Sequence, residues 1–196
     1  MKNFIFQCIF LCCGIFNVQS QSESIEKVVN SYLSAIENKD YQLLAKYLDN
    51  TLYDDMTPAD LAEGLIDAMT GEDAMPMEIS NASFVESGNV INSDGNKYAP
   101  VKISYTIQVP FMGEFTEMVV ENLQLSHGED NVVRDDENEI ITASIEEYII
   151  ARFDEDQNTW KLFTPQMMYF SDSMNEELQY NIMEQISVWK LDRMPN

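Results

Sequence analysis

Cysteine is confined to the first residues of this chain. The three cysteines among the 196 residues are Cys8, Cys12 and Cys13, and none follows them. A thiol is required for a disulfide, for a thiolate metal site and for a cysteine nucleophile. A domain built from residues 21–196 alone can therefore contain none of these three features.

Histidine and glycine are also scarce. His127 is the only histidine, which excludes a two-histidine metal site and a relay between two imidazoles. The seven glycines form no glycine-rich phosphate loop, and no serine lies in the elbow motif of hydrolases. His127 precedes Gly128 at a predicted helix end. We interpret it as a partly exposed terminal residue, whose positive form would suit the helix dipole.

Basic residues are few, because 11 of them face 34 acidic residues and leave a net charge of −23. Such a charge repels nucleic acid and anionic lipid surfaces. Acidic chains can be disordered, but 45% of these residues are hydrophobic and 11% are aromatic, which is enough for a folded core. The composition therefore predicts an acidic globular domain that does not bind nucleic acid.

The first 20 residues have the three parts of a secretory signal peptide. Lys2 gives a positive start, residues 5–18 are almost wholly apolar, and Ser20 closes a cleavage site. A buried helix or an uncleaved anchor is the alternative, but the apolar run is shorter than the about 20 residues that span a bilayer. Leu11 before Cys12 does not fit lipoprotein processing. We expect an exported protein, periplasmic or extracellular, with no stable membrane anchor after cleavage.

Residues 21–196 have the length of one domain, which opens with three predicted helices. A capping box at Ser20–Glu23 begins the first helix, and Asp40 begins the second. Thr57 and the proline after it begin the third, which ends at Gly71 as a left-handed cap. Apolar residues at helical spacing form the expected inner faces: Ile25, Val28, Val29, Tyr32, Leu33 and Ile36, then Leu43, Leu44, Tyr47 and Leu48, then Leu61, Leu65 and Met69.

The hydrophobic period then changes to two, which predicts strands. A strand at 77–87 is followed by a hairpin turn at Asn92–Gly95. Residues 101–109 alternate most clearly between apolar and polar side chains, and Pro110 ends this strand. Further strands are expected at Val132-Val133, Glu139–Phe153 and Thr159–Phe163.

Two more helices are expected outside the opening three. Glu114–Ser126 fits a helix between strands, with Phe115, Met118, Val119 and Leu123 on one stripe, although Val119-Val120 is also compatible with a strand. A capping box at Ser173–Glu176 begins a closing helix with Leu178, Ile182, Ile186 and Trp189. The sequence thus predicts an α+β fold. Its N-terminal helices pack on a curved antiparallel sheet, with an extra helix between strands and a C-terminal helical tail.

The segment Val28–Tyr41 resembles the opening of nuclear-transport-factor-like, or SnoaL-like, domains. Their helix is followed by a small charged turn with Asp and then by a second short helix, and Asn38-Lys39-Asp40 occupies that turn here. Thr159-Trp160-Lys161-Leu162-Phe163, after an acidic hairpin, resembles their late strand. The order of elements agrees across most of residues 23–163. The resemblance implies a cone-shaped curved sheet wrapped on helices, often with an apolar cavity at the open end.

Such families include isomerases, cyclases, dehydratases, binding modules and association domains, so the fold does not select a function. Their enzymes place an Asp, His or Tyr in the cavity, and no position here matches such a pair residue by residue. We therefore assign no catalytic residue, no cofactor and no metal. The primary hypothesis is a module that binds a small apolar ligand or an envelope protein, a pattern also compatible with a homodimer. The alternative is a SnoaL-like lyase or isomerase with a buried carboxylate.

The candidate ligand-binding residues are Tyr32, Tyr53, Asp55, Tyr105 and Trp160. Asp55 follows Tyr53 in the connection where a cavity would open, and we interpret it as a solvated turn residue, with a buried base as the alternative. The Met- and aromatic-rich segment 160–174 fits core packing, a ligand pocket or a subunit interface.

An acidic turn at residues 154–158 has the first spacings of a calcium loop, with Asp154, Asp156 and Asn158. The pattern then fails, because Thr159 stands where glycine is needed and Pro165 stands where a bidentate Glu is needed. We therefore predict an ordinary hairpin turn at this place.

Overall fold

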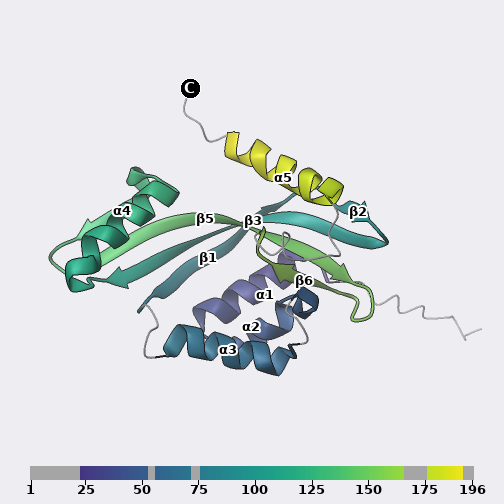
Figure 1. Ribbon diagram of the computed structural model, residues 1–196, viewed down its shortest axis with the longest axis horizontal. Helices are drawn as coiled ribbons and strands as arrows, with labels where there is room; N and C mark the ends of the chain where they lie inside the picture. Colours follow the sequence, from purple (N-terminus) through teal and green to yellow (C-terminus); the bar gives the residue numbers. More distant parts are fainter. Residues whose placement is uncertain (1–22, 53–55, 72–75, 166–175, 192–196) are drawn as a thin grey trace, which may run out of the picture.

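The computed structural model describes residues 23–52, 56–71, 76–165 and 176–191, and the predicted signal peptide of residues 1–20 lies outside them. Helices precede, interrupt and follow a run of strands (Figure 1). The helices are α1 (Ile25–Glu37), α2 (Tyr41–Tyr47), α3 (Pro58–Thr70), α4 (Thr116–His127) and α5 (Glu176–Leu191). The strands are β1 (Glu78–Ser87), β2 (Ile91–Ser93), β3 (Asn96–Pro110), β4 (Val132–Asp135), β5 (Ile140–Asp154) and β6 (Thr159–Phe163). This order confirms the predicted α+β class.

The strands form one open antiparallel sheet. Its order among the described residues is β1-β3-β5-β4, with β2 paired to the start of β3 and β6 paired to the end of β5. β3 and β5 are the two long strands and pair from Tyr98 with Arg152 to Pro110 with Ile140. Residues directly opposite each other in such a pair share a face of the sheet. The register therefore assigns each side chain of β3 and β5 to one of two faces.

α1 covers one face, called the inner face below. Val28, Val29 and Leu33 of α1 are at most 2% exposed. They pack against sheet residues that include Val101, Ile103, Ile149, Ala151, Phe153, Trp160 and Leu162. Each fully buried aliphatic side chain stabilises the fold by about 1.5–3 kcal/mol relative to exposure. This contact between α1 and the sheet is therefore a major source of stability.

α5 covers part of the opposite face, called the outer face below. Leu178, Ile182 and Ile186 of α5 are buried against Tyr98, Tyr148, Ile150 and Phe163. α4 packs at the far end of the sheet, where Val119 and Val120 join a cluster with residues of β4 and β5. In Figure 1, α4 and α5 lie above the sheet, well apart from each other, while α1, α2 and α3 lie below it.

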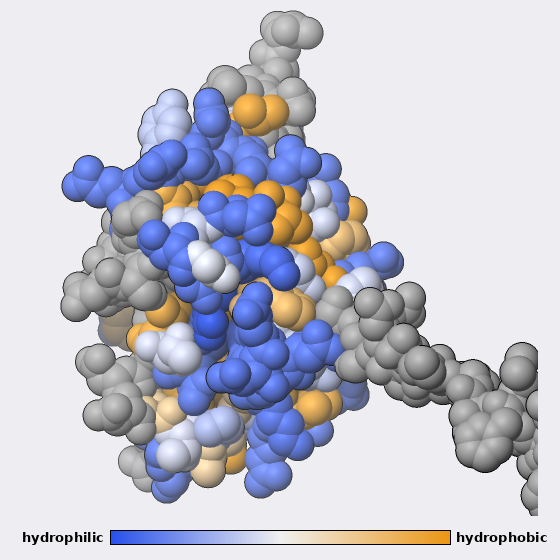
Figure 2. All heavy atoms as spheres, turned by 90° about the vertical axis from the view of Figure 1, so that its right-hand side faces the viewer, coloured by the Kyte–Doolittle hydropathy of each residue, from blue (hydrophilic) through white to orange (hydrophobic). Residues whose placement is uncertain are grey.

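The surface agrees with the acidic composition. Figure 2 shows the side of the molecule at the β2 and β6 end, where hydrophilic residues cover most of the face. Hydrophobic residues on this side gather mainly in its upper half. Across the described residues, the most exposed large apolar side chain is Leu125 on α4, at 85%.

The predicted helix signals at Thr57 and Gly128 are confirmed. The Thr57 hydroxyl oxygen accepts from the Asp60 N–H at 3.3 Å, and an Asp60 oxygen accepts from the Thr57 N–H at 2.8 Å. This is a reciprocal capping box, which satisfies two backbone donors at the start of α3. Gly128 ends α4 with φ 93°, a backbone angle that glycine adopts without strain.

Two predicted helix ends are corrected. α1 begins at Ile25, four residues later than a capping box with Ser20 as its N-cap requires, because the N-cap is Ser24, whose hydroxyl oxygen accepts from the Lys27 N–H at 3.2 Å. Gly71 after α3 is extended, with φ −62° and ψ 169°, and does not form a left-handed cap. A Cβ at Gly71 would meet the Asp67 carbonyl oxygen at 2.5 Å, so close packing explains glycine there.

The predicted buried faces of α3 and α4 are also corrected. Met69 of α3 is 36% exposed, because this helix packs on Ala45 of α2 chiefly through its first turns, at Leu61 and Ala62. Phe115 and Met118 are 51% and 53% exposed, because α4 turns a different side to the sheet. That side carries Val119 and Val120, which are both buried.

A buried ion pair joins the segment after α2 to the sheet. Asp49 is fully buried and forms a two-point contact with the Arg152 guanidinium of β5, with Nη2 2.8 Å from Oδ1. The Thr51 hydroxyl donates to the same carboxylate at 2.7 Å, and the Asp49 N–H donates to the Leu162 carbonyl at 3.0 Å. These contacts hold the segment after α2 against strands β5 and β6.

Candidate functional site

A small cavity lies between α1 and the inner face of the sheet. Its volume is about 90 Å³, and it is called the α1 cavity below. Four elements and the residue after β6 contribute its walls. The lining residues are Tyr32, Leu33 and Ile36 from α1, Ile79 and Ala82 from β1, Ile103 and Tyr105 from β3, Glu147 and Ile149 from β5, and Thr164.

The α1 cavity is mainly apolar but contains one polar pair. The Tyr105 hydroxyl donates to Glu147 Oε2 at 2.7 Å. The sheet register explains this meeting, because Tyr105 lies opposite Ile145 and Glu147 lies opposite Ile103. Tyr105 and Glu147 are therefore diagonal neighbours on the inner face, within reach of a long side chain.

The Tyr105 hydroxyl is held in its protonated form. Burial raises the pKa of Tyr105 well above its ordinary value, and the charge of Glu147 and the hydrogen bond to it raise this pKa further. The phenol thus acts as a hydrogen-bond donor at any physiological pH. It occupies one carboxylate oxygen, and in the described part of the chain no protein group donates to the other oxygen of Glu147, which can accept from a donor group that enters the α1 cavity.

Tyr32 lines the same cavity as Tyr105 and Glu147. Its electrostatic interaction with Tyr105 adds to the causes that raise the pKa of Tyr105. Tyr32 is half-buried and follows the buried Val28 and Val29 by one helical turn on α1. The helical repeat that buries α1 against the sheet therefore also brings Tyr32 to the cavity wall.

The structure brings together two of the five candidate residues, Tyr32 and Tyr105. Trp160 lies in the core cluster of α1 and the sheet instead, 8% exposed. Its ring meets the Phe153 ring edge to face, with centroids 5.2 Å apart. Tyr53 and Asp55 lie outside the described residues, so their proposed roles stay predictions.

Sequence reasoning missed Glu147, although a signal for it existed. Along β5, Ile145, Glu147 and Ile149 alternate onto one face, and the acidic residue stands between two that are buried. A charged residue at an inward position of a strand is unusual unless it has a partner. The partner could not be identified from one sequence, because Tyr105 is 42 residues away along the chain.

The described residues contain no cluster of three or more His, Cys, Asp or Glu that could hold a metal ion. The acidic turn after β5 forms a hairpin to β6, in which Asp154 Oδ1 accepts from the Gln157 N–H at 3.0 Å. His127 is the last residue of α4 and is partly exposed, as predicted. No helix within the described ranges has the length and apolarity needed to cross a membrane.

Comparison with known proteins gives neighbours among solved structures. One is a protein named as a dehydratase of the NTF2-like family from Streptomyces avermitilis, with 10% identity and a TM-score of 0.36, covering 74% of this chain and 93% of that one. Another is named as a SnoaL-like polyketide cyclase from Shewanella denitrificans, with 17% identity and a TM-score of 0.34, covering 75% and 96%. No protein-family model and no curated protein matches the chain.

These neighbours bear the names of the families that Val28–Tyr41 resembles. At this identity the likeness concerns the fold alone. The class that the structure itself defines is an α+β domain in which helices enclose a small cavity against an open antiparallel sheet. Its function is argued below from the residues of this chain.

Proposed function

We propose that this domain binds a small, largely apolar molecule in the α1 cavity. The observation that carries the proposal is the Tyr105–Glu147 pair inside walls that are otherwise mostly aliphatic. Small-molecule sites typically combine apolar walls with a few polar groups that fix the orientation of the ligand. The available Glu147 oxygen would accept from a single N–H or O–H of the bound molecule.

The volume of the α1 cavity limits the size of the bound part. About 90 Å³ is less than the roughly 150 Å³ of an apolar cavity that holds benzene. The site therefore suits a five-membered ring, a short branched alkyl group, or the apolar end of a longer molecule. A polar atom placed among Leu33, Ile36 and Ile103 would lose its hydrogen bonds to water, so the polar group must point to Glu147.

The test uses two rings of nearly the same shape, pyrrole and furan. Pyrrole carries one N–H donor and furan carries none, so only pyrrole can donate to Glu147. A hydrogen bond to a charged group contributes about 1.5–3 kcal/mol, and we therefore expect pyrrole to bind roughly tenfold or more tightly than furan. Titrations followed by NMR, with shifts at Tyr32 and Ile103, measure both affinities.

The Glu147→Gln variant is the matched control for this preference. It keeps the size of the side chain and removes its charge, so the preference for pyrrole should fall to about threefold or less, because a neutral hydrogen bond contributes less. Furan affinity should change little. Equal affinities for pyrrole and furan in the unmodified protein, or shifts confined to residues outside the cavity, would refute the proposed site.

A second candidate function is proton transfer with Glu147 as the base. The hydrogen bond from the protonated Tyr105 hydroxyl favours it, because a half-buried carboxylate beside a phenol can take a proton from a bound carbon acid. One measurement distinguishes proton transfer from binding alone. Exchange of the α-protons of cyclopentanone in D₂O, above the buffer rate and lost in Glu147→Gln, supports catalysis, whereas an unchanged rate supports binding alone.

We also propose that the domain acts after export, in the periplasm or outside the cell. The order of a positive start, an apolar run and a Ser20 cleavage site supports this proposal. The absence of cysteine after Cys13 is compatible with an oxidising compartment, which permits disulfides without requiring them. The net charge of −23 would keep such a protein soluble and away from anionic surfaces.

A further inference from the structure

The outer face of the sheet changes character along its length. Near α5 it is apolar, with Tyr148 and Ile150 buried. Farther along the same strands it is polar, because Ser104 lies opposite Glu146 and Thr106 lies opposite Ser144. α5 covers the outer face only as far as the start of this polar part. The end of α4 borders the polar part from the other side. A hollow lies over this polar part, bordered by the end of α4.

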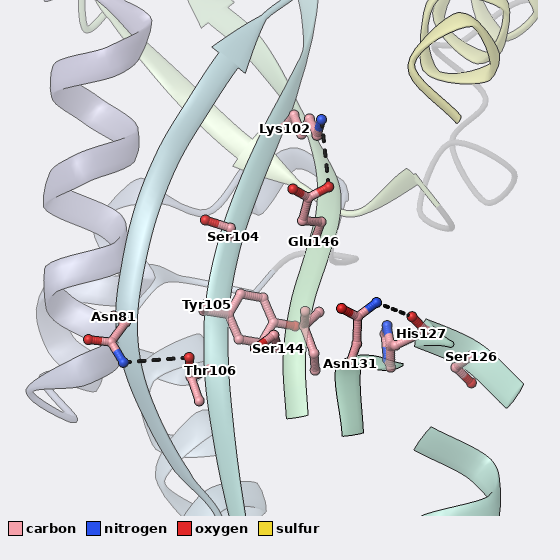
Figure 3. A pocket seen from close by; sticks show the side chains of 11 residues that line it. Asn81, Lys102, Ser104, Tyr105, Thr106, Ser126, His127, Asn131, Ser144 and Glu146 are labelled. Atoms are coloured by element: carbon pink, nitrogen blue, oxygen red, sulfur yellow. Dashed lines mark hydrogen bonds and ion pairs between the residues drawn. The ribbon is translucent and has the colours of Figure 1, made fainter. Parts of the chain in front are cut away.

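This hollow, called the outer groove below, has a volume of about 660 Å³. That volume lies within the range of roughly 300–1,000 Å³ typical of ligand sites. Figure 3 shows its side chains, which come from neighbouring strands and from the end of α4. The polar lining residues are Asn81, Lys102, Ser104, Tyr105, Thr106, Ser126, His127, Asn131, Ser144 and Glu146. Most of its strand residues belong to the face opposite the α1 cavity, and Tyr105 and Ile145 of the inner face also border it.

Hydrogen-bonding groups of both kinds converge on the outer groove. Asn81 contacts the Thr106 hydroxyl at 3.5 Å, and the Ser104 hydroxyl contacts Ser83 at 2.9 Å. Within the described part of the chain, the hydroxyls of Ser126 and Ser144 and the His127 ring have no protein hydrogen bond. Hydroxyl groups act as donors and as acceptors, so this lining can bind a ligand that does the same.

The charges of the outer groove nearly cancel. Lys102 Nζ lies 3.6 Å from Glu146 and 3.7 Å from Glu86, and its side chain is only 13% exposed. The lysine is thus already neutralised and offers little to an anion. The net charge of −23 also repels polyanions and a second copy of this chain. An uncharged polar ligand meets none of these obstacles.

We propose that the outer groove is a binding site for a neutral saccharide. Of the common ligand classes, a neutral sugar combines many hydroxyls that both donate and accept with the absence of net charge. The Ser126 and Ser144 hydroxyls and the His127 ring would bind sugar hydroxyls. This proposal does not rest on the proposed function, because Tyr105 borders both sites but Ser126, Ser144 and His127 line the outer groove alone.

The test titrates the purified protein with two neutral probes, maltotriose and tri-N-acetylchitotriose, and follows backbone amides by NMR. We expect shifts from at least one probe at Ser104, Ser144 and His127, with none at Ile36. The variant Ser144→Arg places a long side chain across the groove and should weaken binding by at least about tenfold, the effect of 1.4 kcal/mol. Ser126→Arg tests the same wall independently if Ser144→Arg does not fold.

The matched control is Ser187→Arg, since Ser187 is exposed on α5 outside the groove. It should bind the probes like the unmodified protein. Absence of shifts with both sugars overturns the proposal, as does binding that Ser144→Arg and Ser126→Arg leave unchanged while both are folded. Trilysine that shifts the groove residues when neither sugar does would instead assign the groove to cationic peptides.

Discussion

Replacing Asp49 by asparagine should lower the free energy of unfolding by about 3 kcal/mol, the lower end of the range for breaking a buried ion pair. The variant keeps the size of the side chain but leaves the Arg152 guanidinium without its counter-charge. The lower end applies because the Arg152 side chain keeps 15% of its surface exposed, so water compensates part of the loss. Urea unfolding followed by circular dichroism measures the difference.

A matched control is the exposed pair between Glu23 and Lys27, whose side chains are 42% and 67% exposed. Glu23→Gln removes the same kind of charge where water screens it, so its effect should be a small fraction of that of Asp49→Asn. Equal effects of the two substitutions would contradict a structural role for the buried pair.

The Asp49 pair also predicts how stability depends on pH. Burial alone would raise the pKa of Asp49, but hydrogen bonds from Arg152 and Thr51 and the charge of Arg152 more than offset it, and the net pKa is lowered. A carboxylate with a lowered folded-state pKa stabilises the protein above its unfolded pKa, near 3.8. This stabilisation is lost as the pH falls through the folded-state pKa. As the pH falls below about 4, the Asp49→Asn variant should therefore lose less free energy of unfolding than the unmodified protein.

Replacing Ala82 by leucine should abolish pyrrole binding. Ala82 lines the α1 cavity from β1, and the added carbon atoms would occupy much of its 90 Å³. The backbone contact of Ala82, whose N–H donates to Glu37 Oε1 at 2.8 Å, does not involve the side chain. Because each buried CH₂ contributes about 0.8 kcal/mol, the free energy of unfolding should stay the same or rise by about 1–2 kcal/mol.

Val85→Leu on the same strand is the control, since Val85 is 40% exposed and does not line the α1 cavity. It should bind pyrrole normally. Loss of binding together with a large loss of stability in Ala82→Leu would mean that the strand had moved. In that case the variant Ile36→Phe, which fills the cavity from α1, replaces Ala82→Leu in the test. Undiminished pyrrole binding in a stably folded Ala82→Leu protein would place the ligand elsewhere.

The sequence predicted the elements well where periodicity and capping agree. The stripe on α1 and the alternation in β3 each specify one buried face, and both faces lie in the core cluster. The buried faces of α3 and α4 were harder to predict, because Met69, Phe115 and Met118 are apolar yet exposed. Helical spacing identifies an apolar side, but the neighbour on which a helix packs decides which side is buried.

The candidate site was predictable only in part. Tyr32 and Tyr105 were identified, but their common position depends on a contact between α1 and β3 that one sequence does not reveal. Glu147 was missed, although it is an acid between two inward residues of β5, because its partner Tyr105 is 42 residues away along the chain. Asp49 and Arg152 gave no signal at all, since their contact spans 103 residues. The outer groove likewise depends on where α4 and α5 stop along the sheet.

The most direct test of ligand binding in the α1 cavity is a crystal structure of the protein soaked in pyrrole. We predict electron density for the ring between Leu33, Ala82 and Ile149, with its nitrogen within about 3 Å of a Glu147 oxygen, the normal hydrogen-bond distance. A ring bound on the surface, or a cavity that stays filled only by water at saturating pyrrole, would contradict the proposed site.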